Sequence, residues 1–299
     1  MSKKQKPVVE KEYKKPLIKR RKANRSVGGD VALYIFLALM AYIMAFPIIF
    51  TVSNSLKPLD ELFKFPPKFY AQHPTLDNFA DLFVNMGKST VTFSRYLFNT
   101  VWITFAGTVG HLIVASMAAF VLAKYKFPGG NFFFKLATTA LMFTGWATAI
   151  PNYLILNKLG WIDTYWAIII PAFASPMGLF LMKQFMEGLP MSLIEAAKID
   201  GASEWKVFIS IVMPNVKPAW MTLIIYSVQG LWNNRASTYI YSEAKKTLVY
   251  ALQQIQAGGI ARTGQSAAVM VVVMIVPIII FVFSESQILE TMASSGLKD

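Results

Sequence analysis

The sequence predicts an all-α, polytopic membrane protein with six transmembrane helices. Hydrophobic residues make up 55% of the 299 residues, and the mean hydropathy of +0.46 is too high for an ordinary soluble domain. Several stretches reach the roughly 20 apolar residues that cross a hydrocarbon layer about 30 Å thick. Their interiors contain no Asp, Glu, Lys or Arg, in keeping with a cost of about 2.5–3.5 kcal/mol for one such charge at the centre of a spanning helix.

Six apolar segments alternate with polar or proline-containing connections. The predicted spans cover residues 31–52, 96–123, 135–156, 165–182, 218–234 and 267–283. Pro171 and Pro176 interrupt the fourth span. Irregular backbone at membrane depth is tolerated mainly where it is buried in protein or borders a cavity, so we expect this span to line the central region.

A basic tail precedes the first span. Eleven of the 29 Lys and Arg residues lie between Lys3 and Arg25, so we expect residues 1–30 to form a flexible cytoplasmic tail. A nucleic-acid-binding arm is the rival interpretation. A basic tail joined directly to an apolar span is better explained by membrane orientation and anionic lipid, and no nucleic-acid partner is expected. With both termini in the cytoplasm, 19 Lys and Arg residues lie inside and 10 outside, a balance set mainly by the tail.

Residues 190–214 form a small-residue, charge-bearing island between the fourth and fifth spans. Pro190 suits the start of a short helix, Gly201 should break it, and Ser203 can cap a second helix that Pro214 should stop. A Glu-Ala-Ala triplet lies in the first helix, and we expect its two alanines to be exposed, so that another backbone can come close. An amphipathic helix pair on the membrane surface would explain the apolar positions but not the spacing from the triplet to the glycine.

This spacing resembles the loop signature of the permease subunits of bacterial ABC importers. The form Glu-Ala-Ala-Lys-Ile-Asp-Gly-Ala-Ser is similar to the carbohydrate-uptake branch, of the maltose-permease type. The runs at residues 124–129, 157–164 and 296–298 look similar to the same family, and the resemblance extends from about residue 30 to the C-terminus. By this resemblance the residues that couple to an ATPase are Glu195, Ala196, Ala197, Asp200, Gly201 and Pro214.

The resemblance implies the type I ABC importer permease fold over residues 31–299, with residues 187–214 as the cytoplasmic coupling loop. It implies a heterodimer with a second, homologous permease, a cytoplasmic dimer of ABC ATPases, an extracytoplasmic solute-binding protein, and a sugar substrate of oligosaccharide size. The chain would form half of the pore in a bacterial cytoplasmic membrane. Closure of the ATPase dimer on ATP would then swing the helices from an inward-facing to an outward-facing state.

No pattern for catalysis or metal binding is present in the sequence. It has no phosphate-binding loop, no His-Glu-x-x-His, no Gly-x-Ser-x-Gly and no cysteine, and its two histidines are far apart. We therefore expect no catalytic residue, metal or cofactor on this chain, with ATP and Mg²⁺ on the partner ATPase. An ion-coupled carrier would need carboxylates inside the spans, and a membrane-embedded enzyme would need a clustered catalytic set. An ABC permease for a non-sugar solute is the nearer alternative.

The fifth span carries the best candidates for solute contact. Polar and aromatic residues recur on one helical face at positions 226, 229, 230 and 233, and amides and aromatic rings suit the hydroxyls and C–H faces of a sugar. Alternatively, Gln229 and Asn233 join helices by hydrogen bonds. The expected substrate-path residues are Tyr226, Gln229, Trp232, Asn233 and Asn234, together with Thr144 and Trp146 in the third span.

Each of these candidates has a structural alternative. Trp232-Asn233 matches a pair in sugar permeases, but Asn234-Arg235 follows where the family often has an acidic residue and later Pro-Leu. Thr144 and Trp146 are equally explained by plain packing. For His111, inside the second span, a neutral side chain hydrogen-bonded to another helix is favoured over a role in proton or ligand binding.

Overall fold

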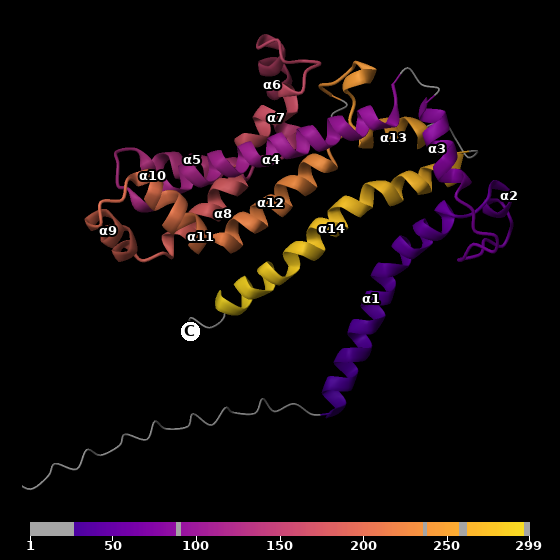
Figure 1. The fold of residues 1–299 in the computed structure, drawn as a ribbon, viewed down its shortest axis with the longest axis horizontal. Helices are drawn as coiled ribbons and strands as arrows, with labels where there is room; N and C mark the ends of the chain where they lie inside the picture. The colour runs from indigo at the N-terminus through magenta and orange to yellow at the C-terminus, as the bar shows by residue number, and fades with distance from the viewer. Residues whose placement is uncertain (1–26, 88–90, 236–237, 257–261, 296–299) are drawn as a thin grey trace, which may run out of the picture. The chain divides into compact units, whose positions relative to one another are not determined.

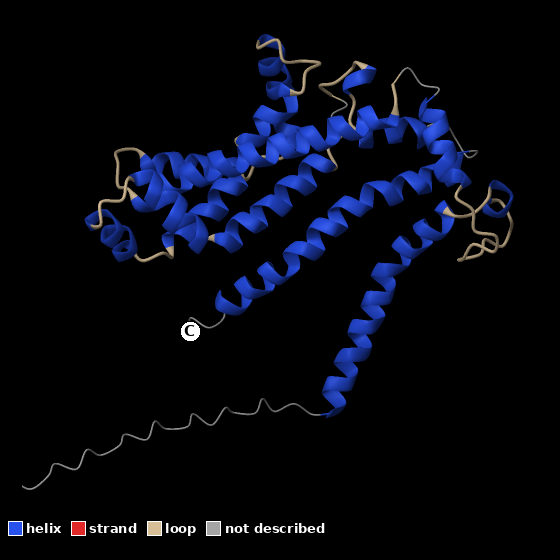
Figure 2. Ribbon diagram, viewed as in Figure 1, coloured by secondary structure: helices blue, strands red, loops and turns tan. Residues whose placement is uncertain are grey.

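The computed structural model describes residues 27–87, 91–235, 238–256 and 262–295, and every regular element in these ranges is a helix (Figures 1 and 2). It divides after Ile48 into two units. The described part of the first unit is residues 27–48, which belong to the apolar helix α1 (Val27–Ser55). Most of the predicted tail and the run at 296–298 lie outside the described residues.

The second unit contains the rest of the described chain. Its helices are α2 (Leu59–Leu62), α3 (Asp77–Gly87), α4 (Phe93–Lys124), α5 (Gly130–Ala140), α6 (Gly145–Lys158), α7 (Trp166–Phe173), α8 (Pro176–Glu187), α9 (Met191–Ile199), α10 (Glu204–Val207), the π-helix η1 (Phe208–Val212), α11 (Met213–Asn215), α12 (Lys217–Trp232), the 3-10 helix η2 (Glu243–Lys245), α13 (Leu248–Gln256) and α14 (Thr263–Ser295).

Four segments of the described chain are long and apolar enough to cross a membrane. They are α1, α4, the α7–α8 run Trp166–Glu187, and Thr263–Phe283 within α14. Two bent helix pairs raise the number to six if each pair counts as one span. The predicted all-α architecture with six spans is confirmed in this form.

The third predicted span, residues 135–156, is wrong as a continuous helix. α5 ends at Ala140, α6 begins at Gly145, and the two axes differ by 111°. Thr144 at the N-cap of α6 is extended, with φ −76° and ψ 153°. An extended residue ends the hydrogen-bond ladder of one helix and starts the next, so the chain turns sharply at this point.

The predicted interruption of the fourth span is confirmed at Pro176 and is wrong at Pro171, which lies inside α7. α7 ends at Phe173, and Pro176 occupies the first turn of α8. The residue before a proline avoids the helical conformation, and Ser175 is accordingly extended, with φ −71° and ψ 116°. Proline at the first helical position lacks only an N–H that would be unpaired in any case.

The fifth span is bent by 81° between α11 and α12. Helical structure continues through Pro214 to Asn215, so the prediction that Pro214 stops the helix is wrong. Proline has no N–H to donate, and the turn before it takes the wider π register of η1. The Trp220 indole donates to the Met213 carbonyl over 3.0 Å, and the Asn215 side-chain amide donates to the Ile211 carbonyl over 2.7 Å. The bend therefore leaves both carbonyls paired.

α4 is the central helix of the second unit and packs against α7, α8 and α12. Small residues on its surface let neighbouring helices approach closely. A Cβ atom at Gly107 would lie 2.6 Å from Leu231 of α12, and one at Gly110 would lie 2.0 Å from Phe173 of α7. Each of the three buried apolar clusters of this unit includes or contacts residues of α4.

Candidate functional site

The first candidate feature is the protrusion formed by α9, α10 and the turn between them. α9 buries Ile194 and Ala197 and turns Glu195 and Ala196 outward. The prediction that both alanines are exposed is wrong for Ala197, which is 8% exposed, because residues three apart share a helix face and Ile194 faces the core. Ala196 is left as the small side chain at the surface.

Large apolar side chains are exposed on the same protrusion. Leu193 and Ile199 lie three residues before and after Ala196, and Ile199 is 86% exposed. Trp205 of α10 and Asp200, the C-cap of α9, are also exposed. Exposed apolar side chains together with polar groups are typical of a surface that binds another protein.

The turn between the two helices is a Schellman motif. The Ala202 amide donates to the Ala197 carbonyl over 2.9 Å, and the Gly201 amide to the Lys198 carbonyl over 3.1 Å. Gly201 has a φ of +78°, the left-handed conformation that this motif requires. Ser203 then caps α10 by accepting an amide hydrogen bond on its hydroxyl. The predicted bend at Gly201 and cap at Ser203 are confirmed.

Polar contacts join the protrusion to the end of α4. Lys198 Nζ lies 2.6 Å from Glu204 Oε1 and donates to the Tyr125 hydroxyl over 3.3 Å, while that hydroxyl donates to Glu204. The hydrogen bonds to Glu204 and then to Tyr125 raise the pKa of Lys198 above its ordinary value. Lys124 Nζ donates to the Leu189 carbonyl over 2.6 Å. These contacts join α9, α10 and the end of α4.

The second candidate feature is a cavity of about 530 Å³ among α4, α6, α7 and α12, within the roughly 300–1,000 Å³ of small-molecule sites. The described polar side chains that line it are uncharged amides, hydroxyls and aromatic groups, together with His111 of α4. His111 is 4% exposed, and its Nε2 has no hydrogen-bond partner among the described residues. The expectation that it bonds to another helix is thus wrong for Nε2, which lies against Gly178 of α8.

The structure separates the predicted substrate-path residues. Tyr226 and Asn234 line the cavity, as does Gly230. Gln229 and Asn233 lie on the exposed side of α12. There the side-chain amide of Asn233 donates to the main-chain carbonyl of Gln229 over 2.9 Å.

The aromatic and third-span candidates lie elsewhere. Trp232 is 2% exposed, and its indole donates to the Val273 carbonyl of α14 over 2.9 Å, so it joins two helices. Thr144 and Trp146 lie at the break between α5 and α6, where Trp146 is 91% exposed, and neither is among the residues that line the cavity.

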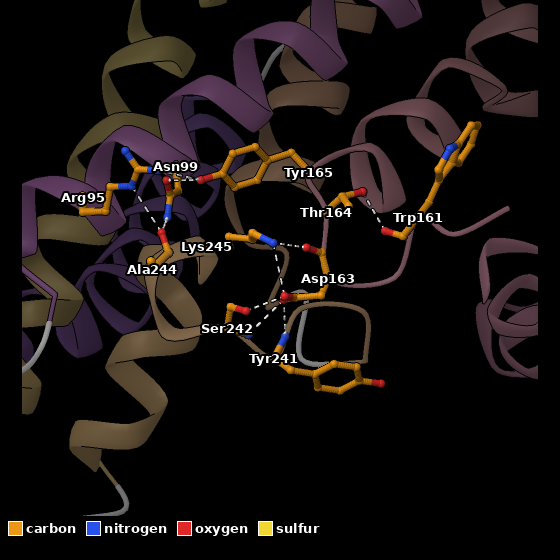
Figure 3. Close-up of polar contacts among 10 residues, drawn as sticks. All are labelled: Arg95, Asn99, Trp161, Asp163, Thr164, Tyr165, Tyr241, Ser242, Ala244 and Lys245. Carbon is orange, nitrogen blue, oxygen red and sulfur yellow. Dashed lines mark hydrogen bonds and ion pairs between the residues drawn. The ribbon is translucent and has the colours of Figure 1, made fainter.

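The third candidate feature is a polar clamp, defined as Asp163 with residues 241–245 (Figure 3). Asp163 Oδ1 accepts the amides of Tyr241 over 3.0 Å and Ser242 over 2.9 Å, and its Oδ2 accepts the Ser242 hydroxyl. Lys245 Nζ lies 3.2 Å from Oδ2 and donates to the Asp163 carbonyl over 2.6 Å. Burial alone would raise the pKa of Asp163, but the hydrogen bonds from Ser242, Tyr241 and Lys245 outweigh it and hold the pKa well below its ordinary value.

A second polar group ties the clamp to α4. Asn99 Nδ2 donates to the carbonyls of Ala244 and Lys246, each over 2.9 Å, and its Oδ1 accepts the Tyr165 hydroxyl over 2.7 Å. Arg95, one turn earlier on α4, donates to the Ala244 carbonyl over 3.3 Å (Figure 3). Segments distant in sequence, the start of α4, the loop at 161–165 and the loop at 239–245, are thus held together.

Sequence reasoning did not select the clamp residues, although it contained a signal for them. Asp163 lies within the run at 157–164 that carried part of the family resemblance. Arg95 and Asn99 are four residues apart, which places them on one helix face.

Comparisons with known proteins show the family to which the chain belongs. Residues 69–291 match the family described as "Binding-protein-dependent transport system inner membrane component". Protein LplC of Bacillus subtilis is 35% identical over 233 residues, 76% of this chain and 75% of that protein. The arabinooligosaccharides transport system permease protein AraQ of Halalkalibacterium halodurans is 34% identical over 208 residues, 68% of this chain and 72% of that protein.

A solved structure shows the same fold. The crystal structure of a bacterial ABC transporter involved in the import of the acidic polysaccharide alginate contains a chain that aligns with a TM-score of 0.77, covering 89% of this chain and 99% of that chain at 22% identity. A second structure, of bacterial alginate ABC transporter in complex with alginate pentasaccharide-bound periplasmic protein, aligns with a TM-score of 0.59.

Proposed function

Because the chain belongs to the family of binding-protein-dependent transport system inner membrane components, we propose that it is a pore-forming subunit of an ATP-driven importer of oligosaccharides. The chain forms half of the pathway, beside a second, homologous permease. An extracytoplasmic binding protein delivers the solute, and a separate dimer of ATPase subunits binds ATP and Mg²⁺. The sugar assignment is supported by the named substrate class of the AraQ relative.

The observation that carries the coupling role is the build of the α9–α10 protrusion. It presents Ala196 with exposed apolar side chains, and its Schellman turn and polar contacts hold it in one shape. A rigid, partly apolar protrusion suits a cleft in a partner protein. We assign that cleft to the ATPase, with Glu195 as a polar contact at its edge.

Packing supplies a route from the protrusion to the cavity. Ile194 of α9 belongs to the same buried cluster as Phe120 of α4 and Leu223 of α12. Tyr226 lies three residues after Leu223, on nearly the same face, and lines the cavity. Nucleotide can shift the equilibrium between the two states of the transporter only by the difference in its affinity for them. A movement of α9 would then displace α12 through this buried cluster.

Gly201→Val tests this role. A β-branched residue in the left-handed conformation is strained by roughly 1–2 kcal/mol or more, while a Cβ at this position meets nothing within 4 Å, so the damage is confined to the turn. We expect the variant to reach the membrane but to lose the ATPase during purification, or to hydrolyse ATP without transport.

Gly160→Val is the matched control. Gly160 also has a positive φ, +68°, and open space around its Cβ position, but it lies far along the chain, after α6. This variant should retain the ATPase. Normal transport by Gly201→Val, or equal loss of the ATPase in both variants, contradicts the coupling role.

An importer of a non-sugar solute is the alternative within the same family. Uptake of labelled oligosaccharides by the complete transporter in proteoliposomes separates the two. Uptake that needs ATP and the binding protein supports the sugar assignment, and ATP-driven uptake of only amino acids or inorganic ions contradicts it.

A further inference from the structure

We propose that the 530 Å³ cavity is a binding site for an uncharged saccharide unit, and that Asp163 is a positioning residue for its aromatic wall. This inference rests on the proposed function and deepens it. It names the class of sugar, neutral as opposed to acidic, and the residues that select it.

The lining of the cavity has the chemistry of a neutral sugar site. Among the described residues that line it there is no Asp, Glu, Lys or Arg. Asn152 of α6 provides an amide with both a donor and an acceptor, and Tyr226 of α12 provides a hydroxyl on an aromatic ring. Both side chains are exposed. A sugar hydroxyl needs such paired donors and acceptors, and the C–H face of a pyranose packs on an aromatic ring.

An acidic sugar lacks a partner in this lining. Moving a carboxylate out of water is unfavourable unless a cation or several hydrogen-bond donors face it. Lys158 and Arg235 adjoin lining residues in the sequence, but neither lines the cavity. Lys245, on the clamp, is paired with Asp163. The lining therefore disfavours a uronate such as a unit of alginate, the polysaccharide named for the structural relative.

Two aromatic residues of the wall come from the clamped loops. Trp161 and Tyr239 both line the cavity. Asp163 stands two residues after Trp161, and its amide donates to the Tyr239 carbonyl over 2.8 Å. Its carboxylate meanwhile holds the amides of Tyr241 and Ser242. The clamp thus fixes the backbone that carries both rings, and it does so from outside the cavity, since Asp163 is not among the lining residues.

Uptake by the complete transporter in proteoliposomes tests the site. The neutral probes are arabinotriose, maltotriose, xylotriose and cellotriose, and the acidic probes are trimannuronate and trigalacturonate. We expect uptake of at least one neutral probe and of neither acidic one. For that neutral probe, Tyr226→Ala and Asn152→Ala should each raise KM about 5- to 20-fold, the loss of one or two hydrogen bonds.

Asn157→Ala is the control, because Asn157 is on the same helix as Asn152 and exposed but does not line the cavity. It should leave KM unchanged. Asp163→Asn should raise KM while the half-saturating ATP concentration and the yield of assembled transporter stay constant, and Asp163→Glu should recover part of the loss. An equal fall in assembly and in the maximal rate, with KM unchanged, would mean that Asp163 is only structural.

The outcomes separate this inference from the proposed function. Uptake of a neutral probe that Tyr226→Ala and Asn152→Ala leave unaltered overturns the site alone, as does uptake of an acidic probe. A transporter that takes up none of the saccharides, but hydrolyses ATP in response to another class of solute, overturns the proposed function and the site together.

Discussion

Asp163 combines an unusual backbone with an unusual number of partners. Its φ of 58° is positive, a conformation that aspartate tolerates better than most residues. In this conformation the carboxylate accepts two amides and a hydroxyl and pairs with Lys245. All of these partners donate, so the site is built for a negative charge.

Asp163→Asn should destabilise the protein at neutral pH. The amide replaces an acceptor with a donor that faces other donors, and hydrogen bonds to charged groups contribute about 1.5–3 kcal/mol. We expect a lower midpoint of thermal unfolding in detergent. Asp60→Asn is the control. Asp60 Oδ2 and Lys64 Nζ lie 3.8 Å apart, and the two side chains are 75% and 57% exposed. Such surface ion pairs contribute about 0–1 kcal/mol. Equal midpoints for the two variants would contradict the role of the clamp.

The effect of Asp163→Asn should also depend on pH. The pKa of Asp163 is lowered in the folded protein, so its stabilising contribution is fully present above the ordinary value near 3.9 and is lost as pH falls through the lower folded-state value. The difference in midpoint between wild type and variant should be constant at neutral pH and narrow on acidification below about pH 4. A difference that widens on acidification would show the opposite shift.

Gly178 is required by the packing of His111. A Cβ atom at residue 178 would lie 2.1 Å from His111 Nε2 and 2.9 Å from Leu223 Cδ1. Gly178→Ala should therefore destabilise the protein by about 1–3 kcal/mol, the usual cost of overpacking. Gly230→Ala should be neutral or stabilising, because a Cβ there meets nothing within 4 Å and alanine is favoured inside helices by roughly 0.5–1 kcal/mol. Thermal unfolding of both, and recovery when His111→Ala is added to Gly178→Ala, checks the contact.

At the scale of elements, apolar runs predicted most of the helices correctly. α4 and the Thr263–Phe283 part of α14 are close to the predicted spans, because the lipid requires an unbroken apolar helix. The Schellman turn was also predictable, since Gly201 is a local signal that depends on no distant residue.

Features set by tertiary packing were not predictable. The break has only the Thr144-Gly145 pair as its local signal, and both residue types are common inside spans. The burial of Ala197 depends on where the core lies around α9, and the destination of Trp232 depends on α14. Periodicity places Tyr226 and Gln229 nearly on one face, but the boundary between cavity and surface passes between them.

The contact between α9 and α10 yields a test by charge exchange. In the native protein Lys198 Nζ lies 2.6 Å from Glu204 Oε1. Lys198→Glu or Glu204→Lys alone would bring like charges together at this position and should release the protrusion from Tyr125. We expect each single variant to lower the ratio of solute transported to ATP hydrolysed, and the double exchange to restore most of it. Additive losses in the double variant would show that the contact is not what matters.

Across the whole molecule, α4 links the three candidate features. Its start carries Asn99 of the group that ties the clamp, its middle carries His111 of the cavity wall, and its last turn is followed by Tyr125 at the protrusion. The cavity therefore lies along one helix between two polar anchor points. In a transporter, such a helix would connect the ATPase side to the binding-protein side.

This arrangement requires the protrusion and the clamp to lie on opposite sides of the membrane. The positive-inside tendency predicts a cytoplasmic protrusion, chiefly because of the basic tail. The chain contains no cysteine, so one introduced thiol reports one position. In intact cells, a membrane-impermeant maleimide should label Lys64→Cys and Lys158→Cys, both exposed, and should label Lys126→Cys only after permeabilisation. The reverse pattern would invert the topology, and with it the proposal that α9 meets a cytoplasmic ATPase.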